Sequence, residues 1–188
     1  LLAQEKNYEL VNLACSGATT AEGVNGEQKT KNATVPSQLS QLNQFRKPTL
    51  ITVTIGANDI DWTGPIVDCF IAVCGTEKDT ARVTTKLTDL DKNLNTLLTS
   101  IATAYDSTPP KVIFTSYYSF TSPTQSTCAQ FTGVSEEEGL WLANQATRLN
   151  DTIKNATKNY PFAQTAVIVF DNNGLCNQTS WLQGVRDP

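Results

Sequence analysis

Short apolar runs rich in β-branched and aromatic residues alternate along this sequence with longer stretches that have helical periodicity. The runs lie at residues 8–14, 49–55, 111–118 and 166–171, and their near-continuous apolar character is typical of strands in a buried parallel sheet. Parallel strands need crossover connections, which the intervening helices provide. We therefore expect an α/β protein, a three-layer α/β/α sandwich with a mostly parallel sheet, in which residues 1–188 belong to a single domain.

Three segments have the periodicity or the capping residues of helices. Ser37 can cap a short helix that ends before Pro48. From about Asp79 to Tyr105, apolar residues recur at steps of four and three and form one stripe that should face the core. The members of this stripe are Val83, Leu87, Leu90, Leu94, Leu97 and Ile101. Ser135 and Glu138 have the spacing of a capping box and predict the start of a third helix.

Composition excludes several classes of function. The chain holds no histidine, so no imidazole within residues 1–188 can act as a general base. A formal net charge of −4 and the lack of clustered Lys and Arg argue against nucleic acid as a partner. No apolar run approaches the roughly 20 residues of a membrane-spanning helix, so we expect no transmembrane segment. The absence of methionine predicts that the natural protein continues upstream of Leu1.

The five cysteines suggest disulfides formed in an oxidising compartment. Cys69 and Cys74 enclose a short loop, Cys128 and Cys176 could close a long one, and Cys15 is left over. The alternative is five buried free thiols in a reducing compartment. A metal site is disfavoured, because the chain has neither histidine nor a pair of Cys-x-x-Cys motifs. We expect no metal and no cofactor.

Two polar segments follow the first two apolar runs, at the strand ends where α/β proteins bind ligands. Residues 12–20 read Asn-Leu-Ala-Cys-Ser-Gly-Ala-Thr-Thr, and residues 55–60 read Ile-Gly-Ala-Asn-Asp-Ile. Gly17 has no Cβ, so its backbone N–H can come close to a ligand, and Asn58 offers a side-chain amide. Together these donors could hold the oxyanion that develops during acyl transfer.

The two segments resemble the second and third conserved blocks of SGNH (GDSL-type) hydrolases, in the secreted lipase and esterase branch of actinobacterial type. The resemblance implies a flavodoxin-like fold and cofactor-free ester hydrolysis by a serine nucleophile, with Gly17 and Asn58 as the oxyanion hole. The family's Gly-Asp-Ser block would precede Leu1, and its Asp-x-x-His block would follow Pro188. The resemblance therefore implies a domain truncated at both ends, and we expect residues 1–188 alone to be catalytically inactive.

Further properties follow from the same resemblance. Members of that branch hold three disulfides, which implies the pairs Cys69–Cys74 and Cys128–Cys176 and a cysteine upstream of Leu1 as the partner of Cys15. The resemblance also implies a secreted monomer whose substrate is a small-molecule ester or an ester of a lipid or sugar.

Other interpretations of single residues are weaker. Ser16 could be taken for a nucleophile, but the chain holds no histidine base. Asp59 and Asp61 begin like an EF-hand loop, yet its twelfth position is Phe70 instead of a bidentate Glu, which argues against calcium. Glycosylation is left open at the four Asn-x-Thr sequons, which start at Asn32, Asn150, Asn155 and Asn177.

Two other functions compete with ester hydrolysis. A non-catalytic SGNH-like module that binds a glycan or lipid would also retain the two polar segments. A flavodoxin-like nucleotide binder would share the sheet, but no strand end carries a Gly-rich phosphate loop. We therefore rank the hydrolase first and the binding module second.

Overall fold

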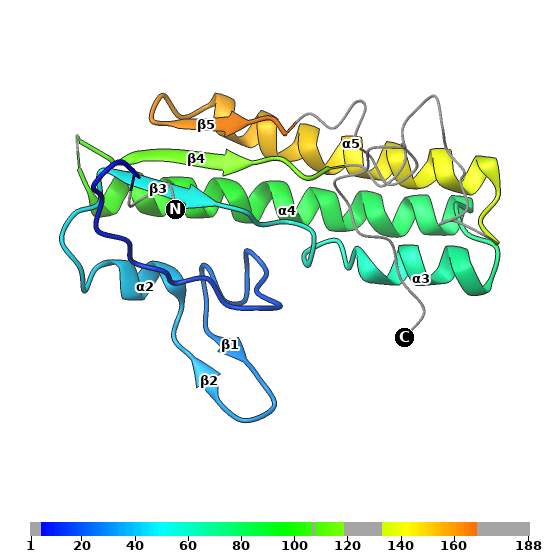
Figure 1. Ribbon diagram of the computed structural model, residues 1–188, viewed down its shortest axis with the longest axis horizontal. Coiled ribbons are helices and arrows are strands. Elements are labelled where there is room, and N and C mark those ends of the chain that lie inside the picture. Colours follow the sequence, from blue (N-terminus) through cyan, green and yellow to red (C-terminus); the bar gives the residue numbers. More distant parts are fainter. Residues whose placement is uncertain (1–4, 107, 119–132, 169–188) are drawn as a thin grey trace.

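The computed structural model describes residues 5–106, 108–118 and 133–168. In chain order, its elements are β1 (Gln28–Lys29), β2 (Thr34–Val35), α2 (Gln38–Leu42), β3 (Leu50–Val53), α3 (Thr63–Ile71), α4 (Glu77–Ala104), β4 (Lys111–Thr115), α5 (Glu136–Lys158) and β5 (Ala163–Ala166) (Figure 1). None of the described helices combines the length and the apolar character needed to cross a membrane.

A three-stranded parallel sheet forms the centre of the described chain. The strands lie in the order β3-β4-β5, with Leu50 opposite Lys111 and Phe114 opposite Thr165. Each strand is joined to the next by a long helix, α4 or α5, so the connections are crossovers of the type that parallel strands require. The α/β class and the parallel sheet expected from the sequence are confirmed.

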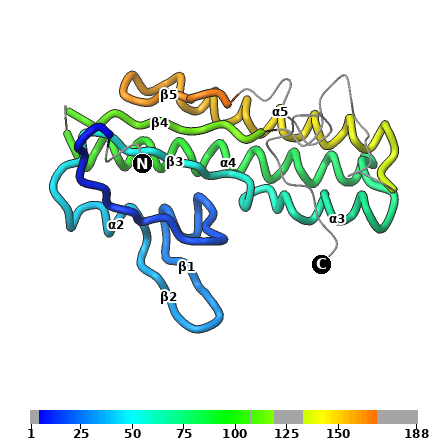
Figure 2. Tube along the Cα trace, in the orientation of Figure 1, coloured from blue at the N-terminus to red at the C-terminus, as the bar shows by residue number. Residues whose placement is uncertain are grey.

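Helices α4 and α5 pack side by side and cover one face of this sheet, and Figure 2 shows both running well past the strands. Val112 and Phe114 of β4 are buried in one cluster with leucine side chains of α4 and with Leu149 and Ile153 of α5. All six stripe residues predicted for α4 are buried. Burial of this continuous apolar face, rather than helix propensity, supplies most of the stability of such helices.

The first predicted strand is wrong. Residues 8–14 form no ladder with any described strand, and Tyr8, Leu10 and Val11 are 55%, 75% and 41% exposed. A lone extended segment leaves its backbone groups to water and gains nothing from its apolar side chains. Apolar composition alone therefore does not make a strand here.

The last strand begins earlier than predicted, and two elements were missed. β5 spans Ala163–Ala166, because the chain turns at Pro161 and enters the ladder with Ala163 opposite Val112. Residues 169–171 of the predicted strand lie outside the described residues.

The sequence analysis missed α3 because its apolar residues form no regular stripe and it contains Pro65. This proline lies in the first turn of the helix, where proline is tolerated. β1 and β2 form a hairpin of two-residue strands, too short to give an alternation pattern.

The predicted caps of α2 and α5 are present. The Ser37 hydroxyl accepts from the Ser40 N–H at the start of α2. At the start of α5, the Ser135 hydroxyl accepts from the Glu138 N–H, and the Glu138 carboxylate accepts from the Ser135 N–H at 2.8 Å. Both helices therefore begin where the sequence predicted.

Glu138 also connects α5 to a disulfide loop. Cys69 at the end of α3 is bonded to Cys74, and their Cα atoms lie 4.8 Å apart. The Cys74 N–H donates to the second carboxylate oxygen of Glu138 at 2.9 Å. This bond and the one from Ser135 lower the pKa of Glu138 from its ordinary value of 4.5.

We expect Glu138→Gln to lower the free energy of unfolding at pH 7, because the amide keeps one acceptor oxygen and loses the charge. A lowered pKa in the folded state contributes stability above the unfolded pKa, and this contribution is lost as pH falls through the folded pKa. The difference between wild type and variant should therefore shrink below about pH 4.5. Urea unfolding at several pH values measures it, with exposed Glu137→Gln as the control for helix charge. A difference that is constant with pH would contradict the assignment.

Candidate functional site

The loop at residues 15–28 lies against the segment that follows β3. The Asn58 side chain donates through Nδ2 to the Ala18 carbonyl at 2.9 Å, and the Thr20 N–H donates to the Asp59 carboxylate. The two polar segments singled out in the sequence are thus in contact, although Gly17 and Asn58 are far apart along the chain. Their proposed role as oxyanion donors stays a prediction.

Gly17 lies in a tight turn of residues 15–18. The Ala18 N–H donates to the Cys15 carbonyl at 3.2 Å, and Gly17 has a φ of 76° while Ser16 does not have a positive φ. A positive φ at the third residue alone is the signature of a type II turn, which favours glycine there. Gly17 is exposed, and within the described residues its N–H has no hydrogen-bond acceptor. This N–H can therefore bind a ligand.

Asn58 is placed by the end of β3. Gly56 precedes it with a φ of 127°, and a Cβ at Gly56 would lie 3.0 Å from Leu149 and 3.2 Å from Leu90. The absence of a side chain thus lets the strand end sit directly on the core helices. Asn58 itself is exposed. One amide hydrogen is used by the Ala18 carbonyl, and the amide has a second hydrogen to offer.

Asp59 and Thr20 hold the two segments together, a contact that the sequence did not reveal. The fully buried Thr20 donates its N–H to both carboxylate oxygens, at 2.9 and 3.1 Å, and its hydroxyl to Oδ1. Burial raises the pKa of Asp59 above 3.8, while the donors from Thr20 lower it in part. Thr20 and Asp59 are 39 residues apart, so only their positions in the two polar segments hinted at a contact.

Tyr117 adds a contact from the end of β4. Its hydroxyl accepts from the Ala57 N–H at 3.3 Å, and burial raises the pKa of this phenol. The Tyr117 backbone is held by Asn150 of α5, which accepts from its N–H at 2.7 Å and donates to its carbonyl at 2.8 Å.

Because both ends of the Asn150 amide are engaged and partly buried, glycosylation is disfavoured at this sequon. Asn32 and Asn155 are exposed, and Asn177 lies outside the described residues.

Several other candidates are not part of this site. Cys15 is half-buried and has no disulfide partner within the described residues, and Cys128 and Cys176 lie outside them. The Asp59 carboxylate accepts hydrogen bonds from Thr20, and the Asp61 carboxylate forms an ion pair with Lys86 at 3.6 Å. The segment that begins like an EF-hand therefore does not form a cation-binding loop. In the described part of the chain, no three His, Cys, Asp or Glu side chains gather as metal ligands.

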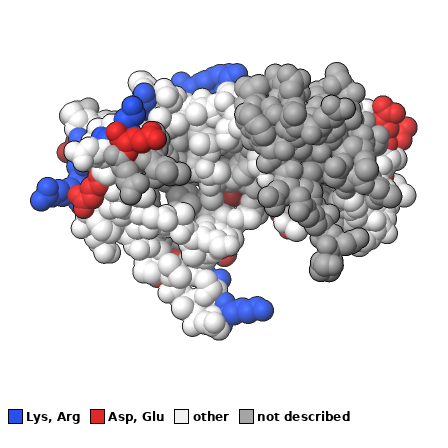
Figure 3. Space-filling view, in the orientation of Figure 1, with Lys and Arg blue, Asp and Glu red and all other residues white. Residues whose placement is uncertain are grey.

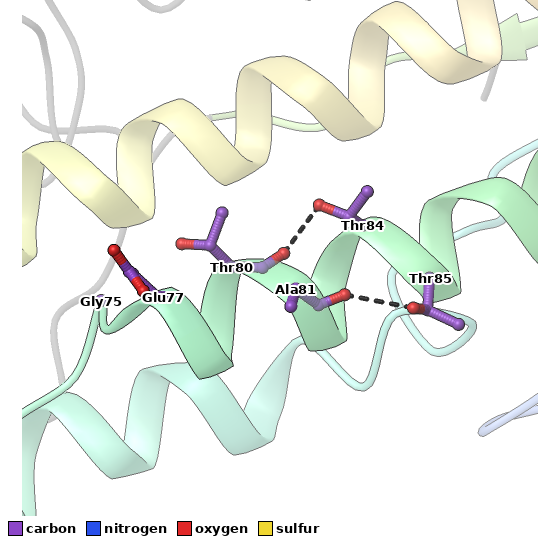
Figure 4. Close-up of a pocket in the computed structure, with 6 residues that line it drawn as sticks. All are labelled: Gly75, Glu77, Thr80, Ala81, Thr84 and Thr85. Carbon is purple, nitrogen blue, oxygen red and sulfur yellow. Dashed lines mark hydrogen bonds between the residues drawn. The ribbon is translucent and has the colours of Figure 1, made fainter.

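A shallow hollow at the start of α4 contains few groups that could act in catalysis. It is lined by Gly75, Glu77, Thr80, Ala81, Thr84 and Thr85 on and just before α4 (Figure 4). The Thr84 and Thr85 hydroxyls donate to carbonyls one turn earlier in their own helix.

On the face shown in Figure 3, the described Lys and Arg side chains lie at separate places and form no single patch. The contacting segments at residues 15–28 and 55–60 are therefore the better candidate site.

We expect Thr20→Val to lower the free energy of unfolding at neutral pH by about 1–3 kcal/mol, because the partly buried carboxylate of Asp59 loses a donor. Since the folded-state pKa of Asp59 is raised, its ionisation costs stability as pH rises through that pKa, and the variant increases this cost. The destabilisation should therefore shrink in acid, where Asp59 is protonated. Urea unfolding against pH tests this, with Thr20→Ser as the control that keeps the hydroxyl. Equal stability of Thr20→Val and wild type at all pH values would contradict the role of this contact.

Comparisons with known proteins agree with this architecture. The sequence matches the GDSL-like Lipase/Acylhydrolase family over residues 1–187. An extracellular lipase from Streptomyces rimosus is similar in structure, with 22% identity and a TM-score of 0.57 over 94% of this chain and 69% of that chain. Phospholipase A1 from Streptomyces albidoflavus NA297 is 19% identical, with a TM-score of 0.59 over 98% and 72% of the two chains.

At these identities, the likeness to the two solved structures concerns the fold. Among curated proteins, no sequence matches this chain. The family match spans nearly all of the sequence, and the segment that holds Asn58 follows β3, at the sheet edge where α/β proteins bind ligands. The chain belongs to the GDSL-like lipase/acylhydrolase family of hydrolases.

Proposed function

We propose that this protein hydrolyses carboxylic esters and that the Gly17 N–H and the Asn58 side-chain amide hold the oxyanion. The observation that carries the proposal is the contact between the two loops. Asn58 Nδ2 lies 2.9 Å from the Ala18 carbonyl, next to a Gly17 N–H that is exposed and has no acceptor within the described residues. Two donors on adjoining loops, held before substrate arrives, are what a developing oxyanion requires.

The chemistry needs a nucleophile and a base besides these donors. A serine oxygen attacks the ester carbonyl while a base takes its proton, and the carbonyl electrons move onto the oxygen that Gly17 and Asn58 face. The tetrahedral intermediate then expels the alcohol, which takes the proton back from the base and leaves an acyl-serine. Water, deprotonated by the same base, attacks the acyl-serine in a second round, and the acid leaves as the serine regains its proton. Residues 1–188 hold no histidine, so a histidine base would lie outside them. We therefore expect this piece alone to be inactive.

The substrate class and the location are inferred from the solved relatives and from the disulfide. The two solved relatives are described as a lipase and a phospholipase, which favours an acyl ester of a lipid; acyl groups on sugars are the alternative. The Cys69–Cys74 disulfide suits an oxidising compartment, and the Streptomyces rimosus lipase is extracellular. We therefore propose that the protein is secreted, and we expect it to act as a monomer without a cofactor.

Substitution of Asn58 in the whole natural protein tests this function. We expect Asn58→Ala to lower kcat for p-nitrophenyl butyrate by about 100- to 1,000-fold with little change in KM, because the lost donor acts only in the transition state. Asn95→Ala is a matched control, since Asn95 also donates its amide to a backbone carbonyl, that of Asp91 at 2.8 Å, but lies on α4.

Three other results would revise the proposal. Equal kcat in Asn58→Ala and wild type would remove Asn58 from the oxyanion hole. Hydrolysis by residues 1–188 alone, abolished by Asn58→Ala, would show that the piece is not inactive. A whole protein that binds the ester or a glycan without hydrolysing it would favour the non-catalytic binding module.

A further inference from the structure

Gln28 is a buried polar residue to which the proposed mechanism gives no role. It belongs to the short strand β1 and is 7% exposed. Its Nε2 donates to the Ser16 carbonyl at 2.8 Å, and its buried Oε1 has no partner within the described residues. A buried amide oxygen without a partner costs free energy. The bond to Ser16 is thus the one hydrogen bond that this buried amide makes within the described chain.

The loop at residues 15–28 packs closely against the Gln28 side-chain amide at Gly23. A Cβ at Gly23 would lie 2.9 Å from Gln28 Oε1 and 2.7 Å from the Ala18 Cβ, so no larger residue fits there without a shift. The reverse orientation of the amide would set Oε1 against the Ser16 carbonyl oxygen, and two acceptors repel. The donor of Gln28 is therefore directed at residue 16.

The bond fixes the direction of the Gly17 N–H. The Ser16 carbonyl and the Gly17 N–H belong to one planar trans peptide, in which they point in opposite directions. This peptide is the central one of the turn, and type I and type II turns differ by a rotation of roughly half a turn about it. Holding the Ser16 carbonyl toward Gln28 thus keeps the Gly17 N–H pointing away from Gln28, where no described residue accepts it.

We propose that Gln28 is a positioning residue that locks the Ser16–Gly17 peptide in the orientation that presents the Gly17 N–H to the oxyanion. This inference rests on the proposed function, because it assigns Gln28 to the same oxyanion hole. Gln28 does not touch the substrate; it acts through the peptide that does. Its effect should appear in the transition state and not in substrate binding.

Two variants of the whole natural protein test the proposal. In Gln28→Glu, the introduced carboxylate repels the Ser16 carbonyl and attracts the Gly17 N–H, which favours the flipped peptide. We expect kcat to fall about 100-fold at neutral pH with KM within about twofold, as for loss of an oxyanion donor. The ratio of variant to wild-type kcat should rise in acid, because a protonated carboxyl can again donate to Ser16.

Gln28→Met removes both polar atoms at similar volume, and we expect a smaller fall in kcat, about tenfold, because nothing then attracts the Gly17 N–H. Gln28→Met also decides the question if Gln28→Glu does not fold. The matched control is Gln41→Glu, since Gln41 Nε2 likewise donates to a backbone carbonyl, that of Pro36 at 2.9 Å, outside the turn. Its kcat should equal that of wild type.

Hydrogen exchange of the Gly17 amide gives a readout that does not need activity. The amide should exchange fast in wild type and be protected in Gln28→Glu at neutral pH. An active wild type whose kcat is unchanged by both Gln28 variants would overturn the positioning role and leave the proposed function standing. A lower melting temperature with unchanged kcat would also overturn it, since the role would be structural. An inactive wild type with the expected exchange change would support the locked peptide and refute ester hydrolysis.

Discussion

The hydrogen bonds between Thr20 and Asp59 are the contact on which the candidate site depends. They join the loop at residues 15–28 to the segment that follows β3, beside the 2.9 Å hydrogen bond from Asn58 Nδ2 to the Ala18 carbonyl. The contact has a cost, because burial of the carboxylate raises its pKa. A partly buried charge such as that of Asp59 is tolerated when several donors satisfy it. The backbone and side-chain donors of one residue do so here.

The core determines where the strand-end side of the site lies. Val112 and Phe114 bury the sheet against α4 and α5, and Gly56 lets the end of β3 rest on Leu90 and Leu149. Asn58 comes two residues later, so its position follows from the packing of the helices. Rigid placement of this kind matters for an oxyanion donor, which stabilises the transition state because it need not reorganise during the reaction.

The two donors are held by different physical means. Asn58 is an exposed side chain that follows the core-packed Gly56 and donates one hydrogen bond to the Ala18 carbonyl. The Gly17 N–H is a backbone group, and its direction depends on a single peptide plane in an exposed turn. A peptide in a turn can flip at modest cost, whereas a strand end cannot move without disturbing the core. The turn therefore needs a hydrogen bond that fixes its peptide plane, whereas the segment after β3 does not. Gln28, which is buried, donates that bond to the Ser16 carbonyl.

The sequence by itself determined the features that depend on near neighbours along the chain. The stripe from Val83 to Ile101 and the caps at Ser37 and Ser135 were predictable, because helical periodicity and capping involve residues only three or four positions apart. The family match and the segments holding Gly17 and Asn58 were likewise visible in the sequence. Tertiary structure alone decided that residues 8–14 pair with no described strand, that β5 starts at Ala163, and that Gln28 contacts Ser16 and Thr20 contacts Asp59. Strand pairing and hydrogen bonds between distant residues depend on which surfaces the core brings together, and no local pattern encodes that.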